Sequence, residues 1–156
     1  MRIDQIAVGD LEDVSQLFSR YRQFYGEPDE PLACQRFLNS RLQGNEAILF
    51  GAWQDTTLVG FTQLYPSFSS VAMQRVWILN DLFVDEHARR QGVGKALLNR
   101  AVAFAEQTHA ARLVLCTGVE NKAAKTLYES EGWRLHEGYD YYVFTPEVTT
   151  SPSESG

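Results

Sequence analysis

The sequence has few of the residues that build disulfide frameworks and metal sites. It contains only two cysteines and three histidines. Cys34 and Cys116 lie far apart in apolar patterns, which favours buried free thiols over a disulfide in a chain of cytosolic type. The histidines have no metal-ligand spacing with the cysteines or with one another, so we expect no metal. A cysteine nucleophile at Cys116 is conceivable, but no histidine stands in a recognisable partnering motif.

Long apolar runs and an excess of positive charge are also missing. No stretch approaches the roughly eighteen apolar residues that span a bilayer, and the first residues lack the pattern of a signal peptide. We therefore expect a soluble, cytoplasmic protein with no membrane partner. Lys and Arg number 14 against 20 Asp and Glu, a formal net charge of -6. This balance argues against nucleic acid, which requires a basic face, and is compatible with a cationic substrate.

The residues that are present fit one globular domain. The 156 residues, of which 44% are hydrophobic, are enough to bury a core. Apolar periodicity predicts helices after Asp10, around residues 34–42, over residues 93–108 and over residues 122–131. Strand patterns cover residues 2–8, 47–54, 57–65, 75–84, 112–117, 133–136 and 140–144. A polar loop is expected at residues 66–70, and a disordered tail at residues 147–156 after a domain of residues 1–146. These patterns alone indicate an α+β or α/β fold.

Residues 89–95, Arg-Arg-Gln-Gly-Val-Gly-Lys, form a basic turn between an expected strand and an expected helix. Free backbone N–H groups, a helix dipole and flanking cations together suit a pyrophosphate. The alternative is a solvated turn that needs glycine for its backbone angles. A Walker A loop does not fit, because Arg89 and Ala96 replace residues that it needs. A dinucleotide fingerprint does not fit either, because its third glycine is Leu97.

A second motif spans residues 121–133, Asn-Lys-Ala-Ala-Lys-Thr-Leu-Tyr-Glu-Ser-Glu-Gly-Trp. Asn121 suits a helix N-cap and Gly132 the left-handed position after a helix, so the segment alone is a well-capped short helix. Its pattern is Asn-x-x-Ala-x-x-Leu-Tyr-x-x-x-Gly-Phe/Trp, and that of the basic turn is Arg/Gln-x-x-Gly-x-Gly/Ala. With both, the chain resembles the GCN5-related N-acetyltransferase (GNAT) family over roughly residues 3–144. It is similar to the small histone, polyamine and thialysine acetyltransferase-like branch.

The resemblance implies a fold and a co-substrate. The implied GNAT fold is an α+β, three-layer architecture with a mixed, mostly antiparallel, splayed sheet, in the order β-α-α-β-β-β-α-β-α-β-β. The implied co-substrate is acetyl-CoA, with its pantetheine arm along a strand and its pyrophosphate on the amides of the basic turn. The implied binding residues are Leu82, Phe83, Val84, Arg89, Arg90, Gln91, Gly92, Val93, Gly94, Lys95 and Asn121.

The resemblance also suggests catalytic residues. Tyr128 is the expected general acid, since a phenol can protonate a departing thiolate; the alternative is a core tyrosine with a hydrogen-bonded hydroxyl. Related enzymes carry an acidic pair where this chain has Asn80 and Asp81. Asn80 cannot usefully accept a proton, which leaves direct base catalysis there in doubt. Asp81 is then expected to bind the cationic acceptor or to act through water, unless it is a satisfied strand-edge carboxylate.

The acceptor is expected to be a primary amine, either of a small molecule such as a polyamine or amino acid, or of a lysine side chain. Aromatic rings and carboxylates suit an alkylammonium, and the residues expected to bind it are Tyr25, Glu27, Tyr65 and Asp81. Further candidates are Tyr21, Asp29, Glu30, Trp77, Tyr139, Asp140 and Tyr141. For Glu27, Asp29 and Glu30, the favoured interpretation is that they are solvated acids in a turn-forming loop. A non-catalytic acyl-CoA sensor is the alternative function, and a homodimer through the aromatic C-terminal residues is a possible assembly.

Overall fold

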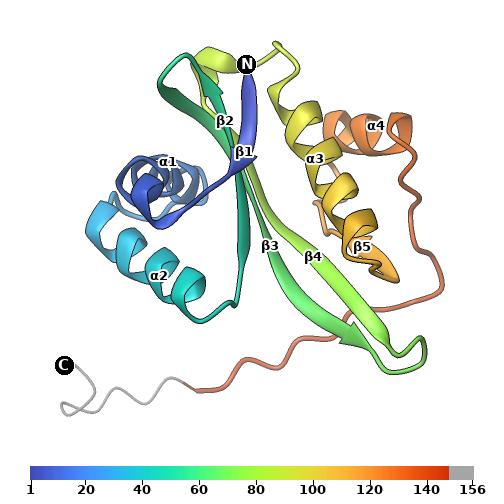
Figure 1. Cartoon of the computed structure of the whole chain (residues 1–156). Coiled ribbons are helices and arrows are strands. Elements are labelled where there is room, and N and C mark those ends of the chain that lie inside the picture. The colour runs from blue at the N-terminus through green and yellow to red at the C-terminus, as the bar shows by residue number, and fades with distance from the viewer. Residues whose placement is uncertain (148–156) are drawn as a thin grey trace.

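A twisted sheet with helices on both faces forms the body of the protein in the computed structural model, which describes residues 1–147 (Figure 1). The strands are β1 (Arg2–Gln5), β2 (Ile48–Gln54), β3 (Thr57–Ser69), β4 (Gln74–Val84) and β5 (Arg112–Val114). The helices are α1 (Leu11–Gln23), α2 (Pro31–Gln43), α3 (Val93–Gln107) and α4 (Lys122–Ser130), with short 3-10 turns η1 (Val8–Asp10) and η2 (Glu86–Ala88). This architecture confirms the predicted α+β class. Within residues 1–147, no helix is long and apolar enough to cross a membrane.

The strands follow the order β1-β2-β3-β4-β5 across the sheet. The first three neighbouring pairs are antiparallel, whereas β4 and β5 are parallel because α3 crosses over between them. Parallel pairing covers only three positions and ends at Ile78 opposite Val114. Beyond Ile78, the edge of β4 that faces away from β3 has no strand partner in the part of the chain that the structure describes. The sheet is therefore split between β4 and β5.

A β-bulge in β4 changes which face its side chains take. Gln63 pairs with Asp81, but the next pair is Leu64 with Leu79, so Asn80 is one extra residue in β4. Successive side chains of a strand point to opposite faces, and a one-residue insertion reverses the alternation on either side of it. Asp81 and Phe83 consequently face α1 and α2.

Two apolar clusters hold the helices against the sheet. The cluster under α1 and α2 contains Val14, Leu17 and Leu38, all fully buried. The cluster under α3 contains Leu97, Leu98 and Ala101 on one helix face. Close packing of α3 depends on Gly60 of β3. A Cβ atom there would meet a side-chain carbon of Val93 at 3.0 Å and one of Leu97 at 3.1 Å.

The helix start predicted at Asp10 is confirmed, but the capping hydrogen bond expected from its side chain is absent. Asp10 is the residue before α1, yet its side chain makes no hydrogen bond to the first turn of that helix. Its carboxylate accepts a hydrogen bond from the backbone N–H of Ala7 at 2.9 Å instead.

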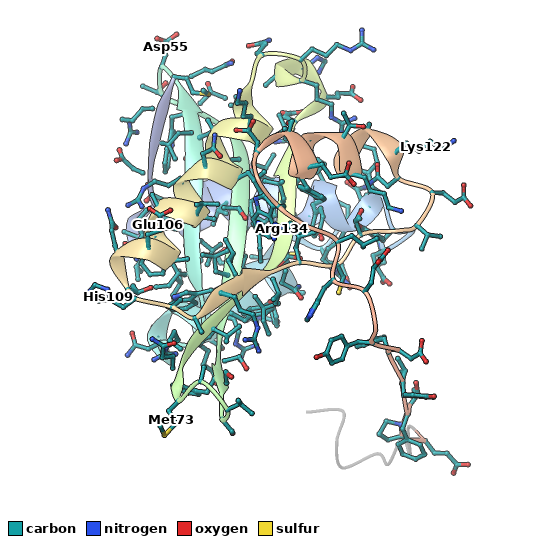
Figure 2. The ribbon with its side chains drawn as sticks, turned by 90° about the vertical axis from the view of Figure 1, so that its right-hand side faces the viewer. Asp55, Met73, Glu106, His109, Lys122 and Arg134 are labelled. Atoms are coloured by element: carbon teal, nitrogen blue, oxygen red, sulfur yellow. The ribbon has the colours of Figure 1, made fainter. Side chains whose placement is uncertain are left out.

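The polar loop predicted at residues 66–70 is wrong, since β3 continues to Ser69. Pro66 stands opposite Trp77 of β4, and β2 starts opposite Leu64, so the missing N–H of Pro66 falls on the free edge of β3. Figure 2 shows Met73 in the turn that follows, at the opposite end of the sheet from the β2–β3 turn at Asp55.

The two strands predicted at residues 133–136 and 140–144 are also wrong: the structure has no strand among residues 133–147. Aromatic and β-branched residues there have strand propensity, but a strand also needs a partner, and this segment leaves the body of the molecule (Figures 1 and 2). Of the predicted tail, residues 148–156 lie outside the described residues.

Candidate active site

A buried carboxylate stands beside the bulge of β4. Asp81 is 6% exposed, and its Oδ2 accepts a hydrogen bond from Gln63 Nε2 at 2.8 Å. Asn80 Nδ2 lies 3.2 Å from both of its oxygens. Gln63, itself fully buried, also donates to the hydroxyl of Tyr65 at 3.1 Å. Two donors from neighbouring residues therefore hold the carboxylate in one orientation.

Asp81 lies in the wall of a cavity of about 440 Å³ between α1, α2 and the sheet. The cavity is lined by Phe18, Tyr21, Arg22, Glu30, Ala33, Cys34, Phe37, Tyr65, Asn80 and Asp81. Burial and, next, the charge of Asp81 raise the pKa of Tyr65 to about 12. The same two causes, in that order, hold the pKa of Tyr21 well above its usual range. Both phenols therefore stay protonated at neutral pH. Since Glu30 is paired with Arg22, the cavity joins the carboxylate of Asp81 to aromatic faces and hydroxyl donors.

The acids between α1 and α2 are largely tied to neighbouring side chains. Arg22 lies 2.9 Å from Glu30 and 3.5 Å from Glu27. Ser19 Oγ donates to Asp29 at 2.7 Å and accepts from the backbone N–H of Glu30 at 2.9 Å. Through these contacts, Asp29 and Glu30 attach the loop between α1 and α2 to α1. Glu27, with its side chain 53% exposed, lies at the outer side of Arg22.

The basic turn ends on bare backbone amides. Gly92, at φ 78°, is the residue before α3. No acceptor for the N–H groups of Val93, Gly94 and Lys95 is found within residues 1–147, whereas Ala96 already bonds to Gly92 at 3.0 Å. A Cβ atom on Gly92 would meet nothing within 4 Å. The start of α3 is thus open on the side of its free donors, where the helix dipole favours an anion.

Two side chains of this turn donate to nearby backbone carbonyls. Arg89 Nε donates to the carbonyl of Val84 at 3.1 Å, and its guanidinium lies 5.1 Å from the ring centre of Phe24. Gln91 Nε2 donates to the carbonyl of His87 at 3.3 Å. Arg89 and Gln91 therefore fix the path of the chain from β4 to α3.

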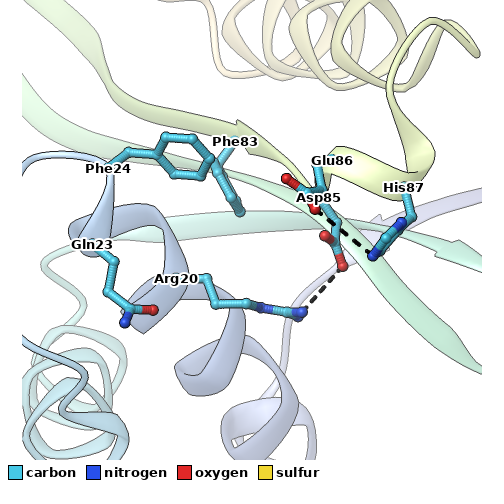
Figure 3. A pocket seen from close by; sticks show the side chains of 7 residues that line it. All are labelled: Arg20, Gln23, Phe24, Phe83, Asp85, Glu86 and His87. Atoms are coloured by element: carbon cyan, nitrogen blue, oxygen red, sulfur yellow. Dashed lines mark ion pairs between the residues drawn. The ribbon is translucent and has the colours of Figure 1, made fainter.

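A second cavity, of about 400 Å³, lies on the α1 side of this connection (Figure 3). Arg20 lies 3.2 Å from Asp85, and the imidazole of His87 lies 3.9 Å from Glu86. Phe24 and Phe83 supply its apolar wall. The Arg20–Asp85 pair connects α1 to the residue after β4, across this cavity.

Tyr128 is held by both ends of α4. At the start, Asn121 Oδ1 accepts from the N–H of Ala124 at 3.3 Å, as the sequence predicted. At the end, Gly132 is left-handed with φ 91°. The N–H of Trp133 bonds to the carbonyl of Tyr128 at 2.9 Å, and their ring centres are 6.0 Å apart. These features form a Schellman motif with its apolar contact, and they make Trp133 a support for Tyr128.

Glu131 ties this helix end to α3. Its carboxylate accepts from Asn99 at 2.9 Å and lies 3.6 Å from Lys95 Nζ. Tyr128 packs, half-buried, against the apolar cluster under α3. Burial and, to a lesser extent, Tyr25 raise the pKa of Tyr128.

Tyr25 connects the two sides of the site. It is 73% exposed, beyond the end of α1, and its ring centre is 5.4 Å from that of Tyr21. After burial, the charge of Asp81 is the next cause of the raised pKa of Tyr21, and Tyr25 is the next cause of the raised pKa of Tyr128. A sequence of phenols therefore runs from the carboxylate of Asp81 towards the helix that carries Tyr128.

Four further candidates for the acceptor pocket lie elsewhere. Trp77 is buried, outside the lining of the Asp81 cavity, and its Nε1 donates to Thr108 at 2.9 Å. Tyr139, Asp140 and Tyr141 belong to the exposed segment after α4. Sequence reasoning missed Gln63, whose signal is a long polar side chain beside Thr62 between the apolar residues Phe61 and Leu64.

Neither cysteine forms a disulfide. Cys34 is buried beside the Asp81 cavity, but Cys116 is exposed, which corrects the expectation that both thiols are buried. In the part of the chain that the structure describes, no three His, Cys, Asp or Glu side chains are grouped as metal ligands.

Comparison with known proteins places the chain among acetyltransferases. Residues 11–133 match the model of the acetyltransferase (GNAT) family. The chain is 41% identical to the uncharacterized N-acetyltransferase YhfO of Bacillus subtilis (strain 168), over 91% of this chain and 95% of that protein. It is 34% identical to a probable acetyltransferase of Haemophilus influenzae, over 87% and 92%. The crystal structure of a probable acetyltransferase matches with a TM-score of 0.89 at 42% identity, over 96% of this chain and all of that one.

Proposed function

Because the chain belongs to the GNAT family and is an N-acetyltransferase, we propose that it transfers the acetyl group of acetyl-CoA to a cationic primary amine. The amine is one of a small molecule, such as a polyamine or amino acid, or a lysine side chain. The observation that carries the proposal is the position of β4. This strand has the carboxylate of Asp81 at its bulge, a free edge beyond Ile78, and the open start of α3 after its end.

The proposed donor site follows the free edge of β4 and ends at α3. The backbone of residues 82–84 would hydrogen-bond the pantetheine arm, as an added strand bonds to a sheet edge. The amides of Val93, Gly94 and Lys95 would bind the pyrophosphate, with help from the helix dipole. Arg90 and Lys95 add positive charge there, and Asn121 stands at the start of α4. GNAT enzymes use acetyl-CoA as co-substrate, and these residues are our assignment of its binding site in this chain.

The proposed acceptor site is the Asp81 cavity. A protonated amine entering the cavity would be attracted by the carboxylate of Asp81 and by the faces of Tyr21 and Tyr65. Tyr25 and Glu27 lie at its outer side and would meet the remainder of the acceptor. Asp81 would then accept the ammonium proton, directly or through a water molecule, because Asn80 beside it has no basic atom.

In the proposed reaction, the deprotonated amine attacks the carbonyl carbon of the thioester. A C–N bond forms, the C–S bond breaks, and the sulfur leaves as the thiolate of CoA. The nitrogen loses its second proton to solvent, and Tyr128 donates its proton to the sulfur and recovers one from solvent. Since the pKa of Tyr128 is raised, the phenol keeps its proton until negative charge develops on the sulfur. We retain cytoplasmic location as an expectation from the sequence, and a homodimer as the assembly that the aromatic residues after α4 favour.

The first experiment is to follow thiol release from acetyl-CoA colorimetrically against a panel of amines. Spermidine, spermine, thialysine, lysine, other amino acids, aminoglycosides and a basic histone-tail peptide make up the panel. Amine-dependent release that is lost in Asp81→Asn, while CoA affinity by calorimetry is kept, is the expected result. Release from an amine that is equally fast in Asp81→Asn would remove Asp81 from the acceptor site. Silence across the panel with acetyl-CoA bound would instead support a non-catalytic acyl-CoA sensor.

A further inference from the structure

The last backbone acceptor on the free edge of β4 is already occupied. Where β4 leaves β3, the N–H of Asp85 bonds to the carbonyl of Val59 at 2.8 Å. The polar groups of successive residues in an antiparallel strand point to opposite edges, so the N–H and the carbonyl of Val84 point away from β3. That carbonyl accepts the hydrogen bond that Arg89 Nε donates at 3.1 Å. The side chain of Arg89 therefore holds an acceptor that the proposed pantetheine arm would use.

Two aromatic rings hold the guanidinium of Arg89 in this position. It lies 5.1 Å from the ring centre of Phe24 and 5.8 Å from that of Phe83. The two rings are neighbours, with centres 5.5 Å apart, on the wall of the cavity beside α1 (Figure 3). A cation is attracted to aromatic faces, but a guanidinium forms stronger, charge-assisted hydrogen bonds with phosphate oxygens. The contact of Arg89 with Val84 is therefore one that a phosphate group can replace.

No carboxylate neutralises Arg89 in the part of the chain that the structure describes. The acids nearest to it in sequence lie elsewhere, Asp85 at 3.2 Å from Arg20 and Glu86 at 3.9 Å from His87. A guanidinium has five N–H donors, and among residues 1–147 only the Nε donor of Arg89 has a partner. The other four are free to bind an anion shortly before the start of α3.

The backbone of the basic turn is also held by contacts that do not involve Arg89. Gln91 donates to the carbonyl of His87 at 3.3 Å and accepts from Gln54 of β2 at 2.6 Å. Arg89 itself is exposed, so its side chain can rotate away from Val84 without opening the core. A change at this position can thus be confined to one side chain.

We propose that Arg89 determines donor specificity, because it occupies the carbonyl of Val84 until a diphosphate draws its guanidinium away. The diphosphate of acetyl-CoA, at the free amides of α3, offers Arg89 the anionic oxygens that its neighbours do not supply. The carbonyl of Val84 is then released to accept an amide N–H of the pantetheine arm. A thioester with the same arm but no diphosphate has to displace Arg89 unaided and binds weakly. This inference rests on the proposed donor site and adds to it a residue that selects against short thioesters.

Acetylpantetheine, which has the thioester and the arm but no diphosphate, is the probe. Calorimetry without an amine should show that Arg89→Ala binds it about tenfold more tightly than the wild type, about 1.4 kcal/mol. The affinity of the same variant for acetyl-CoA should fall, because the contact with the diphosphate is lost. Phe24→Leu removes one ring that holds the guanidinium but keeps Arg89, so it should tighten acetylpantetheine about threefold without weakening acetyl-CoA. The control Arg36→Ala removes the same charge from an exposed position of α2 and should change neither affinity.

Inorganic pyrophosphate tests the same idea with two separate ligands. At saturating concentration it should tighten the binding of acetylpantetheine to the wild type at least fivefold and have no such effect in Arg89→Ala. The proposal is overturned if Arg89→Ala binds acetylpantetheine no better than the wild type does, or if pyrophosphate leaves the wild-type affinity unchanged. Either result with acetyl-CoA still bound by the wild type refutes the role of Arg89 alone. A wild-type protein that does not bind acetyl-CoA refutes the proposed donor as well.

Discussion

Two glycines of the basic turn, Gly92 and Gly94, allow the pyrophosphate assignment to be tested with one methyl group. Gly92 has φ 78°, and a Cβ atom there would meet nothing within 4 Å. The cost of Gly92→Ala is therefore that of a left-handed alanine alone, about 1–2 kcal/mol. For a chain of this size we expect Tm to fall by about 2–8 °C, at roughly 2–4 °C per kcal/mol. The added methyl projects into the open space beside the free amides, so we also expect CoA affinity to fall at least tenfold, about 1.4 kcal/mol.

Gly94→Ala is the matched control. Gly94 lies in the first turn of α3, and a Cβ atom there would lie 3.8 Å from Val84, an ordinary contact. Replacing a helical glycine by alanine stabilises by about 0.5–1 kcal/mol, so Tm should rise by a few degrees. The substitution keeps the backbone N–H of residue 94, so CoA affinity should fall less than in Gly92→Ala. Calorimetric scans and CoA titration measure both quantities. Unchanged CoA affinity in Gly92→Ala would refute the assignment of this turn, and a Tm loss in both variants would refute the backbone argument.

Four further predictions concern the two sides of β4. Tyr128→Phe should lower turnover at least tenfold with CoA affinity unchanged, since only the proposed donor is lost; equal turnover would contradict its role as general acid. Gln63→Leu should lower kcat/KM for the amine at least tenfold, because the carboxylate of Asp81 loses its 2.8 Å donor, whereas the fold should persist by circular dichroism. Gly132→Ala, at φ 91°, should lower the free energy of unfolding by about 1–2 kcal/mol in denaturant titration; no loss would argue against the Schellman end of α4. Because the pKa of Tyr65 is raised to about 12, the stability that its burial gives is complete below pH 10 and is lost between about pH 10 and pH 12. Urea titrations should show this loss, and Tyr65→Phe should make it shallower.

Local chemistry made much of the fold predictable from the sequence. The apolar stripe of α1, the turn at Asp55 and the two ends of α4 at Asn121 and Gly132 each depend on residues close in sequence. The absence of strands in residues 133–144 was not predictable from nearby residues. Their composition fits a strand, but whether a strand forms depends on an edge far away in the chain. Likewise, β3 runs through Pro66 because β4 continues beside it.

The candidate site, too, combines residues of contiguous motifs with residues that meet only in the folded chain. The basic turn and Tyr128 lie in contiguous motifs that sequence alone identifies. Gln63 meets Asp81 because β3 pairs with β4, and Tyr21 meets it because α1 packs against the same face of the sheet. Trp77, by contrast, is an aromatic residue of β4 itself, yet its indole donates to Thr108 on the α3 side of the sheet. Position along a strand therefore decides which aromatic residues can reach an acceptor.

The alternation of side chains in β4 has a consequence for how this enzyme can diverge. Asp81 and Phe83 face α1 and α2, whereas Leu82 and Val84 pack on the α3 side. In the proposed enzyme, substitutions in the wall of the Asp81 cavity, at Tyr65 for example, would alter the preferred amine while the backbone edge of β4 stays in place. Deleting Asn80 would remove only the extra residue of the bulge and join Leu79 to Asp81, so both parts of β4 would keep their facing. In the proposed enzyme, acceptor preference would thus change through the cavity wall, whereas a one-residue insertion or deletion within residues 81–84 would reverse the facing of the side chains beyond it.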